Sequence, residues 1–187
     1  MLWQLRQLAC ALLLLTACAE PQATFTAIDG STVQPMPQPA DAAVVWVFVT
    51  TTCPIANAYA AEISQIADDY KARSVRFLVV HIDPTIDADD MKRHAKEYDL
   101  RCAVVADREH VLVRTAGAVR TPEAALFDAA GELRYRGRID DRFPDLNARR
   151  IPTTSELRDA LDAVLAGRTV AEPRTEATGC LIETPVH

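Results

Sequence analysis

Apolar runs and helical spacings alternate along most of the chain. Residues 44–49 and 75–82 are dominated by apolar side chains, as expected of strands buried on both faces of a sheet. Between them, residues 54–72 carry apolar side chains at helical spacing on one face. A polar helix is predicted over residues 87–98, and a short strand over residues 103–106. This alternation predicts parallel strands that are joined by helices.

The next segment predicts a helix and then an antiparallel hairpin. The helix covers residues 108–116, and Gly117 ends it as a C-terminal glycine. Residues 122–127 and 133–139 are predicted as the two strands of the hairpin, with the turn at residues 129–131.

A closing amphipathic helix is predicted over residues 153–165, with Thr153 or Thr154 as its N-cap. Its inward side chains share helical spacing; they are Leu157, Leu161, Val164 and Leu165. Gly167 ends the helix, and a proline-bearing tail that carries Cys180 follows.

The first residues have the pattern of an export signal. Arg6 precedes an apolar run over residues 8–15, which is too short to span a bilayer because a spanning helix needs about 20 apolar residues. Residues 15–18, Leu-Thr-Ala-Cys, resemble the lipobox of bacterial lipoproteins, in which the cysteine is acylated. The resemblance implies lipidation at Cys18, a membrane anchor and a cell-envelope location facing the periplasm. The alternative is an ordinary secretory signal, and both interpretations predict export.

Length and composition favour a single cored domain in the mature chain. The sequence has 187 residues, of which 49% are hydrophobic. We predict a signal peptide over residues 1–17, then an anchor, a hairpin around Asp29-Gly30 and a proline-rich linker over residues 18–41. The core domain follows over residues 42–167 and the tail over residues 168–187.

The charge of the chain narrows the class of partner. A formal net charge of -6 gives no basic excess, so the sequence predicts no nucleic-acid binding. The expected partner is a small molecule or another protein.

Cysteine provides the candidate chemistry. Of five cysteines, Cys10 lies in the signal and Cys18 at the lipobox, which leaves Cys53, Cys102 and Cys180. Cys53 follows the first buried strand and precedes a helix, with Pro54 at the first helical position. The unpaired amides of a helix start stabilise a thiolate, so Cys53 is predicted to be the nucleophile.

A second element, Thr121-Pro122 before a strand, completes a family pattern. The Cys53-Pro54 helix start, this Thr-Pro and the later hairpin together resemble the thioredoxin-like redoxins of the alkyl hydroperoxide reductase and thiol-specific antioxidant type. The resemblance implies a thioredoxin fold, that is, a central mixed sheet flanked by helices, with an N-terminal hairpin and a strand-helix insert. It also implies a cis Pro122 against the sulfur of Cys53.

The same resemblance implies supporting roles for two further residues. Thr50 would hydrogen-bond the thiolate or a peroxide, and Arg120 would stabilise the thiolate. Residues 135–142 and the Gly179-Cys180 pair also resemble a bacterial subgroup with a Gly-Cys tail.

Two departures limit what can be carried over from the family. The position three residues after Cys53 is Ala56, so the adjacent second thiol of dithiol members is absent. Trp46 stands where peroxidase members have a proline, which weakens a peroxidase assignment.

The thiol that resolves oxidised Cys53 must therefore come from elsewhere. Cys102 precedes a strand whereas Cys53 follows one, so in parallel strands the two cysteines lie at opposite ends of the sheet. Our hypothesis is that Cys180, on the tail, bonds Cys53 and that Cys102 is a packing residue. Another protein, a small thiol, or a tail whose thiol meets nothing in particular are the alternatives.

The sequence thus predicts an exported thiol oxidoreductase without a cofactor. Its substrate would be a peroxide or a protein thiol or disulfide, and a thiol reductant would restore it. The alternative function is a copper chaperone or sensor that uses Cys53, His81 and Cys180, because sulfur and imidazole suit cuprous copper.

Overall fold

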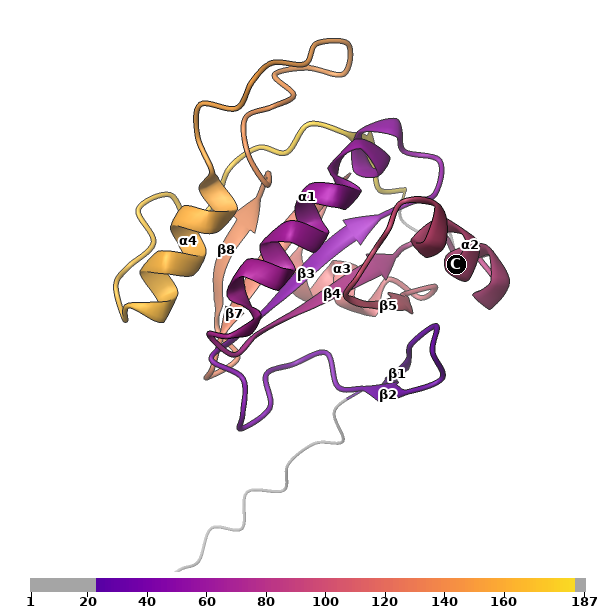
Figure 1. Ribbon diagram of the computed structural model, residues 1–187, viewed down its shortest axis with the longest axis horizontal. Coiled ribbons are helices and arrows are strands. Elements are labelled where there is room, and N and C mark those ends of the chain that lie inside the picture. Colours follow the sequence, from indigo (N-terminus) through magenta and orange to yellow (C-terminus); the bar gives the residue numbers. More distant parts are fainter. Residues whose placement is uncertain (1–22, 184–187) are drawn as a thin grey trace, which may run out of the picture.

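A five-stranded mixed sheet forms the centre of the molecule (Figure 1). The structure is a computed structural model and describes residues 23–183. The sheet consists of β3 (Ala43–Val49), β4 (Val75–His81), β5 (Ala103–Ala106), β7 (Glu123–Asp128) and β8 (Leu133–Gly137). The order across it is β5-β4-β3-β7-β8, with β3, β4 and β5 parallel to one another and β7 antiparallel to both its neighbours.

Within residues 23–183, four helices and two short strand pairs surround the sheet. The helices are α1 (Pro54–Lys71), α2 (Ala88–Glu97), α3 (Val111–Ala116) and α4 (Glu156–Leu165). The strand pairs are β1 (Phe25–Thr26) with β2 (Thr32–Val33), and β6 (Arg120–Thr121) with β9 (Cys180–Leu181).

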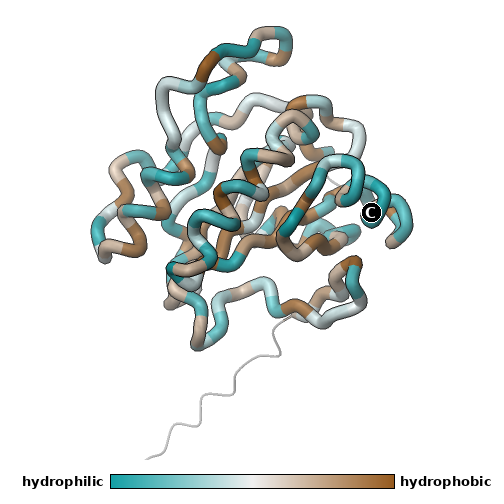
Figure 2. Tube along the Cα trace, viewed as in Figure 1, coloured by the Kyte–Doolittle hydropathy of each residue, from teal (hydrophilic) through white to brown (hydrophobic). Residues whose placement is uncertain are grey.

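The sheet has one hydrophobic core on each face. Side chains of α1, α2 and α4 pack on one face, and side chains of α3 and the N-terminal hairpin pack on the other. Trp46 belongs to the second core, where it is fully buried and its Nε1 donates to the carbonyl oxygen of Pro35 at 2.9 Å. Figure 2 shows hydrophobic residues concentrated in the central strands and hydrophilic ones along the outer helices and loops.

The predicted thioredoxin fold is confirmed, including the N-terminal hairpin and the inserted strand and helix. The buried strands, α1 and α2 begin and end within one residue of their predicted bounds. Gly117 ends α3 in the left-handed region with φ of 70°, as a C-terminal glycine does. Leu157 and Leu161 are fully buried on α4.

Two predicted helix starts are wrong for the same physical reason. The closing helix begins at Glu156. The amides of Thr153 and Thr154 donate hydrogen bonds to the carboxylate of Asp141, so neither residue caps the helix. The preceding helix begins at Val111, because the carboxylate of Asp107, one turn earlier, accepts a hydrogen bond from the Val111 amide. In both cases a carboxylate outside the predicted helix binds the amides at its start.

The export predictions concern residues that the structure does not describe. The signal peptide and Cys18 lie outside residues 23–183. Within those residues, none of the helices is long and apolar enough to cross a membrane.

Candidate active site around Cys53 and Cys180

Cys53 is the N-cap of α1, directly after the loop that follows β3. Its φ of -81° and ψ of 110° are extended, and its side chain accepts a hydrogen bond from the amide of Ala56 at 3.4 Å. Pro54 occupies the first turn, where its missing amide hydrogen leaves no bond unmade. The side chain of Cys53 therefore lies at the positive end of an 18-residue helix.

The surroundings of Cys53 favour its thiolate. Burial alone would raise the pKa of Cys53. Hydrogen bonds to its sulfur act in the opposite direction; they come from the amides of Ala56 and Cys180 and from the side chains of Thr121 and Cys180. These bonds outweigh burial, so the pKa of Cys53 is lowered. The Thr121 hydroxyl is buried and has no other partner, so the thiolate is the acceptor available to it. Cys53 thus gives up its proton more readily than a free cysteine does.

Thr121 and Pro122 lie against the sulfur of Cys53. The peptide bond between them is cis, as the family resemblance implies. In the thiol form, Cys53 Sγ donates to the carbonyl oxygen of Thr121 at 3.0 Å.

The tail returns to this site as a strand, and Figure 1 shows it running from α4 to the end of the sheet where α1 begins. β9 pairs with β6 in antiparallel fashion, which places Cys180 opposite Thr121. Beyond it, the amide of Ile182 donates to the carbonyl oxygen of Val119 at 2.9 Å. The cysteines of the described residues are free thiols, and Cys180 is exposed whereas Cys53 is buried.

Close contact between the tail and the cis-proline loop requires a glycine before Cys180. A Cβ atom at Gly179 would lie 1.9 Å from the carbonyl oxygen of Thr121, closer than real Cβ contacts come. The Gly-Cys order is therefore a steric requirement of the way in which the tail packs on Thr121.

Residues 135–138 hold the tail farther back along the chain. The hydroxyl groups of Tyr135 and Thr175 are 2.7 Å apart, and the amide of Arg138 donates to Thr175 Oγ1 at 3.1 Å. A Cβ at Gly137 would lie 2.1 Å from the same oxygen. Residues 135–138 thus contact, at Thr175, the same tail that carries the Gly179-Cys180 pair.

The supporting roles implied for Arg120 and Thr50 differ from what the structure shows. Arg120 donates from Nη1 to the carbonyl oxygen of Gly179 at 3.1 Å and is 4.0 Å from Glu176, so it holds the tail and is not among the groups that shift the pKa of Cys53. Thr50 contacts Cys53 through the backbone, where its carbonyl oxygen accepts from the Cys53 amide at 3.4 Å. The Arg120 guanidinium binds acceptors of the tail, and the sequence could not place that tail beside it.

Cys102 lies where the sequence predicts. It directly precedes β5, which runs parallel to β3, so it is at the opposite end of the sheet from Cys53. Burial raises its pKa to about 11, which keeps it a thiol at neutral pH. These observations fit a packing residue.

His81 does not form a copper site with the two cysteines. It is fully buried, its ring nitrogens have no hydrogen-bond partner among residues 23–183, and burial lowers its pKa to about 4. It packs against His94 with ring centroids 4.9 Å apart. Within residues 23–183 no three His, Cys, Asp or Glu side chains are grouped so that they could hold a metal ion, so the geometry does not favour the copper alternative.

Sequence reasoning missed a link between the inserted helix α2 and the active-site loop. Asn57 donates from Nδ2 to the carbonyl oxygen of Thr51 at 2.9 Å and to the Tyr98 hydroxyl at 3.2 Å, and its Oδ1 is 2.9 Å from His94 Nε2. Asn57 follows Cys53 by one helical turn, but no local pattern indicates partners 37 and 41 residues away.

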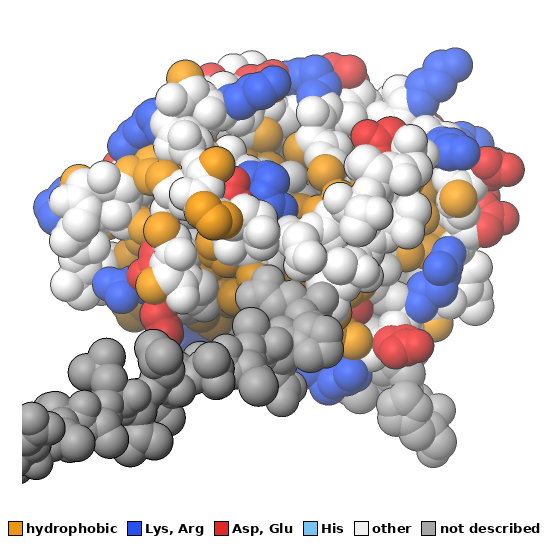
Figure 3. Space-filling view, turned by 90° about the horizontal axis from the view of Figure 1, so that it is seen from below, with side chains coloured by type: hydrophobic (Ala, Val, Ile, Leu, Met, Phe, Trp, Pro, Cys, Tyr) orange, Lys and Arg blue, Asp and Glu red, His pale blue; other side chains and the backbone are white. Residues whose placement is uncertain are grey.

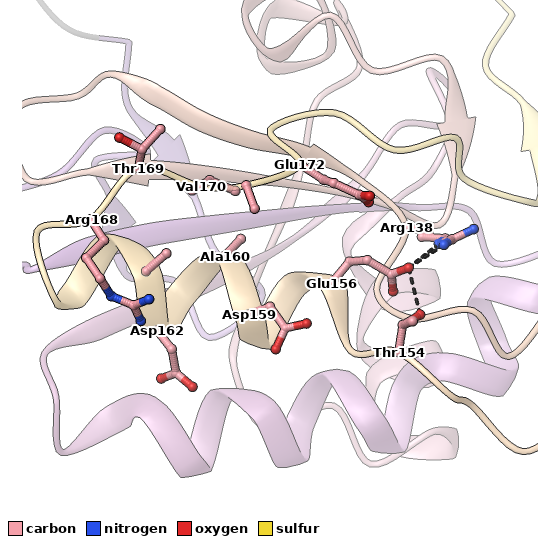
Figure 4. Close-up of a pocket in the computed structure, with 12 residues that line it drawn as sticks. Arg138, Thr154, Glu156, Asp159, Ala160, Asp162, Arg168, Thr169, Val170 and Glu172 are labelled. Atoms are coloured by element: carbon pink, nitrogen blue, oxygen red, sulfur yellow. Dashed lines mark hydrogen bonds and ion pairs between the residues drawn. The ribbon is translucent and has the colours of Figure 1, made fainter.

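A cavity lies away from these residues. It has a volume of about 640 Å³ and lies between α4 and the start of the tail. Figure 4 shows Glu156 at one end of it, paired with Arg138, and Arg168 near its other end. None of the predicted site residues lines it.

Charged side chains of both signs lie on one face of the molecule (Figure 3). Figure 3 shows them around the rim of this face, without a continuous basic patch. The prediction of no nucleic-acid partner stays untested.

Fold and site together define a thioredoxin-fold protein with a cysteine at a helix start. The Redoxin family model matches residues 18–149, more than half of the chain, and the chain belongs to that family. Family membership and the site together support thiol oxidoreductase chemistry. Comparison with curated proteins gives no match.

Solved structures confirm the fold. An uncharacterized conserved protein from Geobacillus kaustophilus is similar with a TM-score of 0.74 and 29% identity, over 89% of this chain and 91% of that chain. A hypothetical protein from Sinorhizobium meliloti has a TM-score of 0.76 and 21% identity, over 88% and 92%. A secreted disulfide oxidoreductase from Mycobacterium tuberculosis has a TM-score of 0.53 and 21% identity, over 78% and 96%.

Proposed function

We propose that this redoxin is a thiol oxidoreductase in which Cys53 is the nucleophile and Cys180 is the resolving thiol. The observation that carries the proposal is the pairing of β9 with β6. It sets Cys180 opposite Thr121, whose carbonyl oxygen is 3.0 Å from Cys53 Sγ. The thiol and amide of Cys180 are also close enough to Cys53 to lower its pKa by hydrogen bonding.

Two thiols in this arrangement complete a two-electron cycle. With a peroxide, the Cys53 thiolate attacks one oxygen, the O–O bond breaks, and the other oxygen leaves as an alcohol or water; Cys53 becomes a sulfenic acid. With a disulfide, Cys53 forms a mixed disulfide and expels one thiolate. In either case the Cys180 sulfur then attacks Cys53, which forms the Cys53–Cys180 disulfide and releases water or the second thiolate.

We propose a disulfide or a peroxide as the oxidant, because both react first with the same sulfur. The described contacts of Thr50 with Cys53 are between backbone groups, and Trp46 is a core residue on the second face of the sheet. These contacts favour neither oxidant over the other. A comparison of peroxide and disulfide consumption therefore distinguishes the two oxidants.

The experiment is a turnover assay with both oxidants and an excess of a dithiol reductant. We expect Cys53→Ser to lose activity with each oxidant that the wild type consumes, and Cys102→Ser to keep it. Equal consumption by wild type and Cys53→Ser in both assays would remove the basis of the proposal.

We also propose that the protein is exported and tethered by lipid on Cys18, facing the periplasm. The support is the Leu-Thr-Ala-Cys sequence at residues 15–18, after a short apolar run. Metabolic labelling with a fatty acid should tag the wild type and not Cys18→Ser, and the labelled protein should sediment with membranes.

A further inference from the structure

The tail covers the buried Cys53, whereas Cys180, on the tail itself, is an exposed residue. Cys53 has 0% of its surface exposed, and Cys180 is in the exposed class. The first turn of α1, the Thr121-Pro122 loop and β9 surround Cys53. A reagent that approaches the site from solvent therefore meets Cys180 first.

The tail also occupies the backbone edge beside the site. β9 pairs with β6, so an extended segment of another protein cannot pair with the same edge while the tail is in place. Hydrogen bonds hold the tail at three further points. They join Ile182 to Val119, Arg120 to Gly179, and Thr175 to residues 135–138. The folded tail therefore covers Cys53.

We propose that external thiols reduce the oxidised site by attacking the sulfur of Cys180, with Cys53 as the leaving group. This rests on the proposed function, because it requires the Cys53–Cys180 disulfide. A reductant thiolate bonds to Cys180 Sγ, the Cys180–Cys53 bond breaks, and its electron pair stays on Cys53. A second reductant thiolate then attacks the reductant's own sulfur in the mixed disulfide, and Cys180 leaves as a thiolate and is protonated. The reductant departs as a disulfide, and two electrons have passed to the protein.

The pKa values of the two possible leaving thiols favour attack on Cys180, as the exposure of Cys180 does. Attack on Cys180 expels Cys53, whose thiolate accepts hydrogen bonds from the backbone amides of Ala56 and Cys180, and these bonds lower its pKa. Attack on Cys53 would instead expel Cys180, whose pKa burial raises. A thiol of lower pKa leaves faster in thiol–disulfide exchange.

The test determines which cysteine of the oxidised full-length Cys102→Ser variant forms a mixed disulfide with glutathione. The disulfide-linked peptide is mapped first, then glutathione is added, and samples are quenched with acid at early times. Free thiols are labelled with N-ethylmaleimide after unfolding, and both cysteine peptides are analysed by mass spectrometry. We expect about ten times more glutathione on Cys180 than on Cys53, with the maleimide label on Cys53.

The outcomes separate the two proposals. Glutathione mainly on Cys53, or equally on both cysteines, overturns the inference and leaves the proposed function intact. If no Cys53–Cys180 peptide forms on oxidation, both proposals fail. A Cys180→Ser variant, oxidised and treated with glutathione, gives the mass standard for Cys53 glutathionylation, so a low signal at Cys53 cannot result from poor detection.

Discussion

Gly179→Ala is the perturbation that tests the tail most selectively. The added methyl group would lie 1.9 Å from the Thr121 carbonyl oxygen and 2.7 Å from its carbon. Backbone cannot yield as a flexible side chain can, so the strand must move away by about 1 Å or more. The φ of Gly179 is not in the left-handed region, so the effect is a steric one.

The magnitude follows from the contacts that this movement breaks. Cys180 would lose its pairing with Thr121, and the hydrogen bonds from Ile182 to Val119 and from Arg120 to Gly179 would weaken. At about 1 kcal/mol for each of two or three bonds, the open form gains roughly 30- to 150-fold in population.

The assay is the rate at which a bulky maleimide modifies the Cys53 peptide, followed by mass spectrometry. We expect Gly179→Ala to raise this rate by the same factor when opening and closing are fast relative to modification. Cys102, at the opposite end of the sheet, is an internal control and should keep its rate, and Glu172→Ala is a matched control on an exposed tail residue. A Cys53 rate equal to that of Glu172→Ala would refute the reasoning that β9 covers the sulfur, and acceleration of both cysteines would indicate general unfolding.

Three further predictions address the thiolate, the link to α2 and the anchor. Cys180→Ala should raise the pKa of Cys53, because the hydrogen bond from the Cys180 thiol is lost. The pH at which Cys53 reaches half of its maximal alkylation rate should then increase, and an unchanged or lower midpoint would contradict this prediction. Asn57→Ala removes three hydrogen bonds and should lower the free energy of unfolding in urea by about 1–3 kcal/mol, whereas exposed Asn147→Ala should change it little. Cys18→Ser should leave the turnover of detergent-solubilised protein unchanged while the protein moves from the membrane to the soluble fraction.

Local signals made the strand-helix framework predictable from sequence. Continuous apolar runs located the buried strands, and Pro54 after Cys53 located the start of α1. The family resemblance supplied the cis bond at Pro122. Each of these depends on residues close together in the chain or on a motif that recurs across a family.

The remaining features depend on contacts between distant segments. Thr153 binds a carboxylate 12 residues away, so its value as an N-cap could not be judged from its neighbours. Arg120 binds the backbone of Gly179, 59 residues later, and this contact directs it to the tail. The sequence suggested Cys180 as a partner for Cys53, but not that the tail would reach it as a strand.

If Cys53 and Cys180 form one redox pair, peptide mapping of the mildly oxidised, non-reduced protein will show it. We expect a linked pair of peptides that contain Cys53 and Cys180, with Cys102 still free. A Cys53 peptide linked to Cys102, or linked to nothing, would contradict it.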